Sequence, residues 1–243
     1  MSRRHKHRKE RRSRNRPRIF PGRADSGFRN GPGDNDSAVL ELFTYELTED
    51  PLPDPYLDSL SPADRDRIDR IAHDFRHCPR DYVARLESCV RDFPDYPKVY
   101  NYLTVAYQDA GRYEDARRLI RETCRRFPDY LFGVANYAFL CIQEGHPEKV
   151  PVVLGNRLAL HHFCGGRRCF HVSEFVTFNA LLAFYFWASG KPDVAMTYRD
   201  ALRKVAPDHS LTRRVDSLFR PASLLRRALA GWFEPHDTHD RYV

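Results

Sequence analysis

Apolar residues recur at intervals of three or four positions from about residue 63 onward. Ile68, Ile71 and Phe75 show this spacing, and similar sets continue along the chain. The spacing places apolar side chains on one face of an α-helix. The sequence therefore predicts an all-α fold over residues 63–219.

The helical region also repeats itself. The segments RDFPDY and RRFPDY contain Pro94 and Pro128, which are 34 residues apart, and Gly111 and Gly145 have the same separation. A 34-residue unit of helix, turn and helix resembles the tetratricopeptide repeat (TPR) family. In such a unit a glycine permits the turn between the helices, and a proline ends the second helix.

The resemblance extends over about 145 of the 243 residues. In the clearest copy, residues 97–130, the family's positions are matched by Tyr100, Leu103, Tyr107, Ala116, Ile120 and Pro128. A second copy matches less faithfully at Val134, Tyr137, Ala138 and Val150. A third copy begins at Val176 and matches at Leu182, Ala183, Phe186, Gly190, Ala195, Leu202 and Pro207. A degenerate copy covers residues 63–96, so the resemblance implies a TPR-like solenoid of about four antiparallel helix pairs.

The flanking segments differ from the repeats. Residues 1–37 are nearly devoid of apolar side chains, which predicts a disordered basic tail. Residues 38–62 form an acidic, proline-rich linker that begins with the apolar island AVLELFTYEL. Residues 220–243 carry an apolar stripe in RPASLLRRALAGWFE, which predicts a C-terminal capping helix over the last repeat; an exposed interaction or membrane-surface helix is the alternative.

Charge is concentrated at the N-terminus. The net charge of the chain is +7, and residues 1–18 contribute ten Lys or Arg against one Glu, or +9, so the remainder carries 7 − 9 = −2. No apolar stretch reaches the roughly 18 residues that a membrane span needs, and no signal-peptide core follows the basic start. We therefore expect a cytoplasmic protein whose six cysteines are mostly free thiols.

An insertion interrupts the repeats. The copies begin at residues 97, 131 and 176, so the last interval is 45 residues and exceeds the period by 11. The segment LHHFCGGRRCFHVSE (160–174) holds the candidate metal ligands His161, His162, Cys164, Cys169, His171 and Glu174. Zinc sites usually contain closely paired ligands, and the CxxxxC spacing here matches that pattern poorly.

Two further interpretations of the insertion are possible. A Cys–His nucleophile would use Cys164 or Cys169, with its pKa lowered by Arg167 and Arg168. The structural interpretation favours a Gly165–Gly166 turn, a packed Phe170, and Ser173 as the cap of the next helix. The FHVSE segment also resembles one in bacterial TPR-like proteins of unassigned function. It implies no mechanism.

The family resemblance implies that the first helix of each pair lines a concave groove. The residues expected to face it are Lys98, Asn101, Tyr102, Val105, Asp109, Phe132, Asn136, Phe139 and Gln143. Val105 and Phe132 stand where a carboxylate clamp needs polar or basic groups, so that activity is not expected. An apolar peptide or helix is the expected ligand. Alternatively, the chain's own Leu40, Phe43 or Tyr45 covers the groove.

The sequence thus favours a protein-interaction scaffold that is not an enzyme and needs no cofactor. One alternative is an adaptor for nucleic acid or the ribosome, anchored non-specifically through Arg3, Arg4, Lys6, Arg8, Lys9, Arg11 and Arg12. The other is a metal-binding or thiol-dependent protein that uses residues 161–174. Partner identity and oligomeric state do not follow from the sequence.

Overall fold

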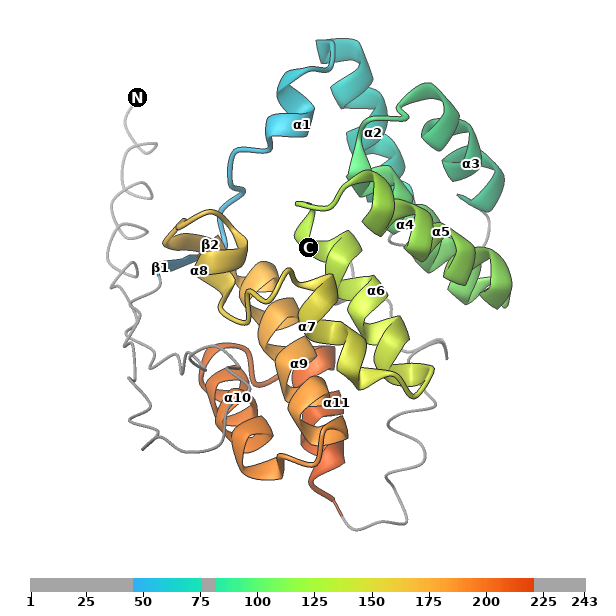
Figure 1. Ribbon diagram of the computed structural model, residues 1–243. Coiled ribbons are helices and arrows are strands. Elements are labelled where there is room, and N and C mark those ends of the chain that lie inside the picture. The colour runs from blue at the N-terminus through green and yellow to red at the C-terminus, as the bar shows by residue number, and fades with distance from the viewer. Residues whose placement is uncertain (1–45, 76–81, 221–243) are drawn as a thin grey trace, which may run out of the picture.

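The computed structural model describes residues 46–75 and 82–220 (Figure 1). Most of these residues are helical, which confirms the all-α class. The α-helices are α1 (Pro55–Asp58), α2 (Pro62–Phe75), α3 (Val83–Asp92), α4 (Pro97–Asp109), α5 (Tyr113–Arg126), α6 (Leu131–Gln143), α7 (Val150–Val153), α8 (Leu160–Phe163), α9 (Val172–Ala188), α10 (Pro192–Val205) and α11 (Ser210–Leu218). A 3₁₀ turn, η3 (Pro147–Lys149), and two short strands, β1 (Glu46–Thr48) and β2 (Cys169–His171), complete the described part. The basic tail (1–37) and the expected capping helix after residue 220 lie outside it.

Three glycine turns close the helix hairpins. Gly111, Gly145 and Gly190 have φ angles of 74°, 81° and 72°, which a residue with a Cβ rarely adopts. After each glycine, the next amide donates to the carbonyl five residues earlier, at 2.7 to 2.8 Å. This bond satisfies a carbonyl at the helix end and reverses the chain. The glycines therefore account for the sharp turns that follow α4, α6 and α9.

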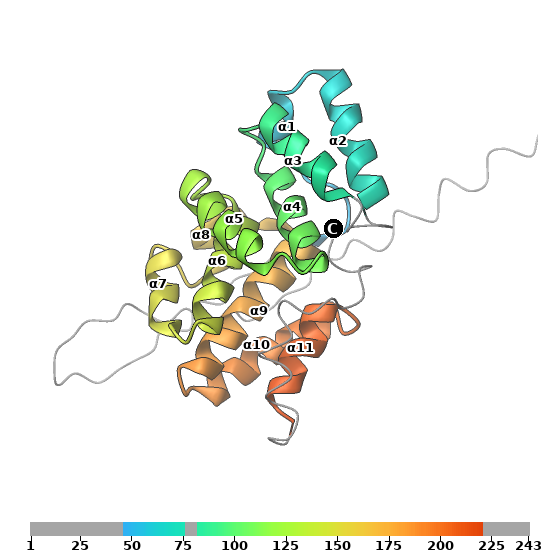
Figure 2. The same ribbon diagram turned by 90° about the vertical axis from the view of Figure 1, so that its right-hand side faces the viewer.

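The helices bury two apolar clusters, which lie toward opposite ends of the molecule (Figure 2). One joins α2, α3, α4 and α5, and the other joins the helices from α6 to α11. Ala116 and Ala195 have no exposed surface at all. A larger side chain at either position would have to displace a packed neighbour.

The helix α9 lies between α6, α10 and α11 (Figure 1). It is apolar on all sides, with Phe175, Phe178 and Leu182 fully enclosed. The insertion before it contributes Leu160 and Phe170, both buried in the same cluster. The last segment of the insertion, β2, pairs in parallel with β1, so that Leu47 lies opposite Phe170.

The cap of α9 differs from the expected one. The N-cap residue is His171, not Ser173, and its side chain accepts a hydrogen bond from the Ser173 amide at 3.1 Å. Glu174 completes a capping box, since its Oε2 accepts from the His171 amide at 2.9 Å. The strand β2 places His171 in an extended conformation at the helix start, which makes it the capping residue.

Gly133 lies where α6 packs closely against the end of α5 and the turn that follows it. A Cβ at this position would lie 2.9 Å from Thr123 Cγ2 and 3.1 Å from Tyr130 Cδ1. Gly133→Ala should therefore lower the free energy of unfolding by ~1–3 kcal/mol, although alanine normally favours a helix. Chemical denaturation measures this loss. In a Thr123→Ser background, which removes the clashing methyl group, the same change should cost less, and an equal cost in both backgrounds would contradict the packing argument.

Candidate functional site

The nine residues expected to line a concave groove do not form an exposed surface. Tyr102, Val105, Asp109 and Phe139 are buried. The other five, which are all half-buried, are Lys98, Asn101, Phe132, Asn136 and Gln143. None of the nine is exposed in the described structure. The segment expected to cover them, which includes Leu40, Phe43 and Tyr45, lies outside the described residues.

Two of the polar residues on this face bind each other. Asn136 Nδ2 on α6 donates to Asn101 Oδ1 on α4 at 2.8 Å. This bond links the first helices of successive hairpins and uses one polar group on each side. Both amide atoms of Gln143, by contrast, are buried without a hydrogen-bond partner. The Asn pair therefore holds α4 and α6 together instead of presenting amides to a ligand.

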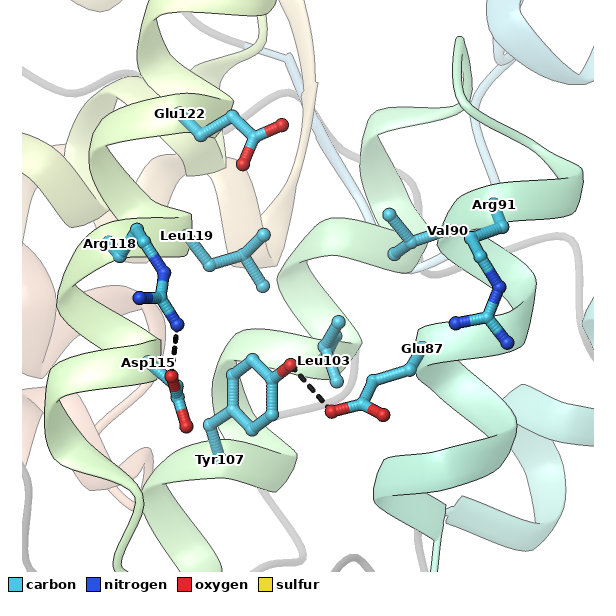
Figure 3. A pocket seen from close by; sticks show the side chains of 9 residues that line it. All are labelled: Glu87, Val90, Arg91, Leu103, Tyr107, Asp115, Arg118, Leu119 and Glu122. Carbon is cyan, nitrogen blue, oxygen red and sulfur yellow. Dashed lines mark hydrogen bonds and ion pairs between the residues drawn. The ribbon is translucent and has the colours of Figure 1, made fainter.

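An open groove lies on another face, between α3 and α5 with α4 as its floor (Figure 3). It has a volume of about 290 Å³. Its apolar lining comes from the half-buried Val90 and from Leu103, Leu119 and the ring of Tyr107, which are buried and expose 3%, 7% and 9% of their surface. The charged residues along its two sides are Glu87, Arg91, Asp115, Arg118 and Glu122.

Tyr107 is held in place by charged residues at one end of the groove. Its hydroxyl donates to Glu87 Oε1 at 2.8 Å, and the Arg112 guanidinium stacks on its ring at 4.4 Å. Arg112 in turn pairs with Glu87 at 3.0 Å and with Asp115 at 2.6 Å. Burial, and then the bond to Glu87, raises the pKa of Tyr107 to about 12. The tyrosine therefore stays neutral at physiological pH and donates a hydrogen bond to Glu87.

Two charges beside the groove remain available. Within the described residues, Arg91 on α3 and Glu122 on α5 make no hydrogen bond or ion pair, whereas Arg118 pairs with Asp115. Figure 3 shows that Arg91 and Glu122 belong to opposite sides of the groove. An apolar lining between a cation and an anion suits a peptide that carries both an apolar and a charged side chain.

Leu103 and Tyr107 match packing positions of the repeat, but the sequence does not predict this groove. A signal was present in the pairs Glu87–Arg91 and Arg118–Glu122, because residues four apart lie on the same face of a helix. Those pairs mark the outward faces of α3 and α5. That the two faces flank one depression depends on how α3 and α5 pack against α4, which a helical period does not specify.

The insertion does not assemble its candidate metal ligands. Within residues 46–75 and 82–220, no group of three His, Cys, Asp or Glu side chains could hold a metal ion. His171 caps α9 and contacts the Glu49 carbonyl at 3.3 Å, while Glu174 binds Arg167 and the His171 amide. His161 is buried with its ring 3.8 Å from that of His162. These side chains are used to build the insertion.

The thiols of the insertion are also not activated. Burial raises the pKa of Cys164 to about 11, although Arg167 acts in the opposite direction. The pKa of Cys169 is raised by burial and by the charge of Glu46. The expectation that Arg167 and Arg168 lower these values is therefore wrong, because desolvation of the thiolate outweighs the attraction of the guanidinium.

No helix in the described ranges is long and apolar enough to cross a membrane. The seven basic residues considered for nucleic-acid binding, from Arg3 to Arg12, lie outside these ranges. Comparisons of the chain with known protein families, curated proteins and solved structures found no match.

The raised pKa of Cys164 has a measurable consequence. The reactive form of cysteine is the thiolate, so at pH 8 a shift from 9 to about 11 should slow alkylation of Cys164 on the order of a hundredfold relative to the unfolded chain. Iodoacetamide labelling followed by peptide mass spectrometry, with and without denaturant, measures the ratio. Equal rates in the two states would contradict the effect of burial.

Proposed function

We propose that this protein is a TPR-type helical repeat scaffold that binds a peptide segment of a partner protein in the groove between α3 and α5. The observation that carries the proposal is the open groove with an apolar lining, beside two charges, Arg91 and Glu122, that make no ion pair with another described residue. The regular glycine turns after α4, α6 and α9 support the repeat assignment. Repeat scaffolds commonly present such surfaces to extended or helical ligands.

The chemistry of the groove favours binding over catalysis. Tyr107 and Glu87 bond to each other, Asp115 is occupied by two arginines, and burial keeps the tyrosine neutral. These groups therefore hold the shape of the groove. The free Arg91 and Glu122 can each pair with an opposite charge on a ligand, while Val90 and Leu119 contact its apolar side chain.

A peptide display selection against the full chain tests this function. Peptides that bind the wild type should lose about tenfold or more in affinity when Val90→Asp places a charge in the apolar lining of the groove. Arg91→Glu or Glu122→Arg should weaken them about three- to tenfold, because an exposed pair contributes ~1 kcal/mol or less and reversal adds repulsion. Fluorescence anisotropy with the selected peptides measures each affinity.

Arg125→Glu is the matched control. Arg125 is exposed on α5, makes no ion pair with another described residue, and does not line the groove. Its reversal changes the net charge as Arg91→Glu does and should leave peptide affinity unchanged. Selected peptides that bind all four variants as tightly as the wild type would refute the groove as the binding site.

A further inference from the structure

The two FPDY segments form matching turns that the groove does not use. These FPDY turns comprise Phe93–Tyr96, between α3 and α4, and Phe127–Tyr130, between α5 and α6. In both, the phenylalanine ends a helix with φ near −125°, and the tyrosine amide donates to its carbonyl at 3.1 Å. The tyrosine then stands at the N-cap of the next helix.

The aromatic residues are not needed to close such a turn. Ala206–His209, between α10 and α11, occupies the corresponding place and has the sequence APDH. Its His209 amide donates to the Ala206 carbonyl at 3.2 Å, as in the FPDY turns. The backbone of the turn therefore forms with alanine and histidine. Phe93 and Phe127 are buried in the apolar cluster, and the rings of Tyr96, Phe127 and Tyr130 also make a contact with another segment.

That contact is with a segment from the N-terminal side of the repeats, which we call the strap (residues 54–60). Tyr56 places its ring edge-on to Phe127 at 6.2 Å and to Tyr130 at 6.4 Å. Asp54 accepts a hydrogen bond from the Tyr96 hydroxyl at 3.3 Å. The strap thus touches both FPDY turns at once, through one aromatic ring and one carboxylate.

The Asp54 carboxylate also prepares the strap for this contact. Its Oδ1 accepts from the Tyr56 amide at 3.0 Å and caps α1, in which Pro55 takes the first position. The cap and the proline fix the short turn that presents Tyr56. Leu57 and Leu60 follow and pack against the same apolar cluster.

The strap is less buried than the surface beneath it. The helix α1 has four residues, none of them fully buried, and a helix this short is not stable by itself. The two aromatics that it covers, Tyr96 and Phe127, are only 3% and 7% exposed. Segments with few buried contacts open at low free-energy cost, so local release of the strap would uncover an aromatic surface.

We propose that the two FPDY turns form a second peptide-binding site, selective for segments with an Asp-Pro-Tyr-Leu pattern, and that the strap occupies it as a tethered ligand. The partner is a protein segment with a carboxylate two residues before a tyrosine and an aliphatic residue after it. The tether gives the strap a high effective concentration, so a partner segment binds when the strap is released. This site is separate from the groove between α3 and α5, and its test is independent of the proposed function.

A labelled peptide tests the site directly. The probe is a fluorescein-labelled peptide of residues 50–60, DPLPDPYLDSL, added to full-length chains and followed by fluorescence anisotropy. Tyr56→Ala in the chain weakens the strap, so this variant should bind the probe saturably and at least tenfold more tightly than the wild type. A probe with alanine in place of its tyrosine is the matched control and should not bind.

Two results, obtained by combining peptide binding with melting curves, circular dichroism and measurement of the oligomeric state, would overturn the proposal. One is a Tyr56→Ala chain that melts cooperatively, keeps its helical circular dichroism and fails to bind the probe. The other is wild-type chain that forms a concentration-dependent dimer lost with Tyr56→Ala, since the occupant would then be the strap of a second copy.

Hydrogen exchange of the wild-type amides tests the same site without a substitution. The strap amides should exchange faster than those of α4, and excess unlabelled peptide should raise strap exchange further by holding the released state. Strap amides that are protected as strongly as α4 and insensitive to the peptide would show that the strap is a fixed part of the fold.

Discussion

The need to enclose α9 organises the second half of the molecule. This helix is apolar on all its faces, and such a helix is stable only when packing covers every side. The neighbours α6, α10 and α11 cover most of it, and the insertion adds Leu160, Phe163 and Phe170 near its first turns. The insertion that breaks the repeat period therefore has a packing role, which accounts for the engagement of its histidines and cysteines in structure.

The packing around α9 also connects residues 46–48, which precede the repeats, to the second half of the molecule. Because β2 forms the last part of the insertion, its parallel pairing with β1 holds residues 46–48 beside α9 (Figure 1). From there the chain reaches the strap, which lies across the turns next to α4 and α6. The strap is thus connected at one end to a strand pair and at the other to α2, whose Ile68 and Ala72 are buried in the core. Local release of α1 would therefore leave both flanking elements in place.

Two surfaces of the protein have different physical characters. The groove between α3 and α5 is open and has the charges of Arg91 and Glu122 beside it. Under the proposed function, its selectivity would depend on apolar fit and on pairing with these two charges. The FPDY turns are aromatic and are contacted by the Tyr56 ring and by the Asp54 carboxylate. A scaffold with both surfaces would recognise different features of its ligands at each surface. A ligand could bind at one surface without a ligand at the other.

The sequence by itself determined the helical class and the positions of the turns, because both depend on local physics. Helical periodicity is a property of neighbouring residues, and the turns at Gly111, Gly145 and Gly190 need a residue without a Cβ. The cap of α9 was misassigned to Ser173, since the pairing of β2 with β1 decided that His171 precedes the helix. The tertiary structure alone decided the burial of Tyr102 and Phe139, the raised pKa of Cys164, the position of the groove and the contacts of Tyr56 with Phe127 and Tyr130. Each of these depends on which faces pack together in the fold, and a local pattern carries no information about that.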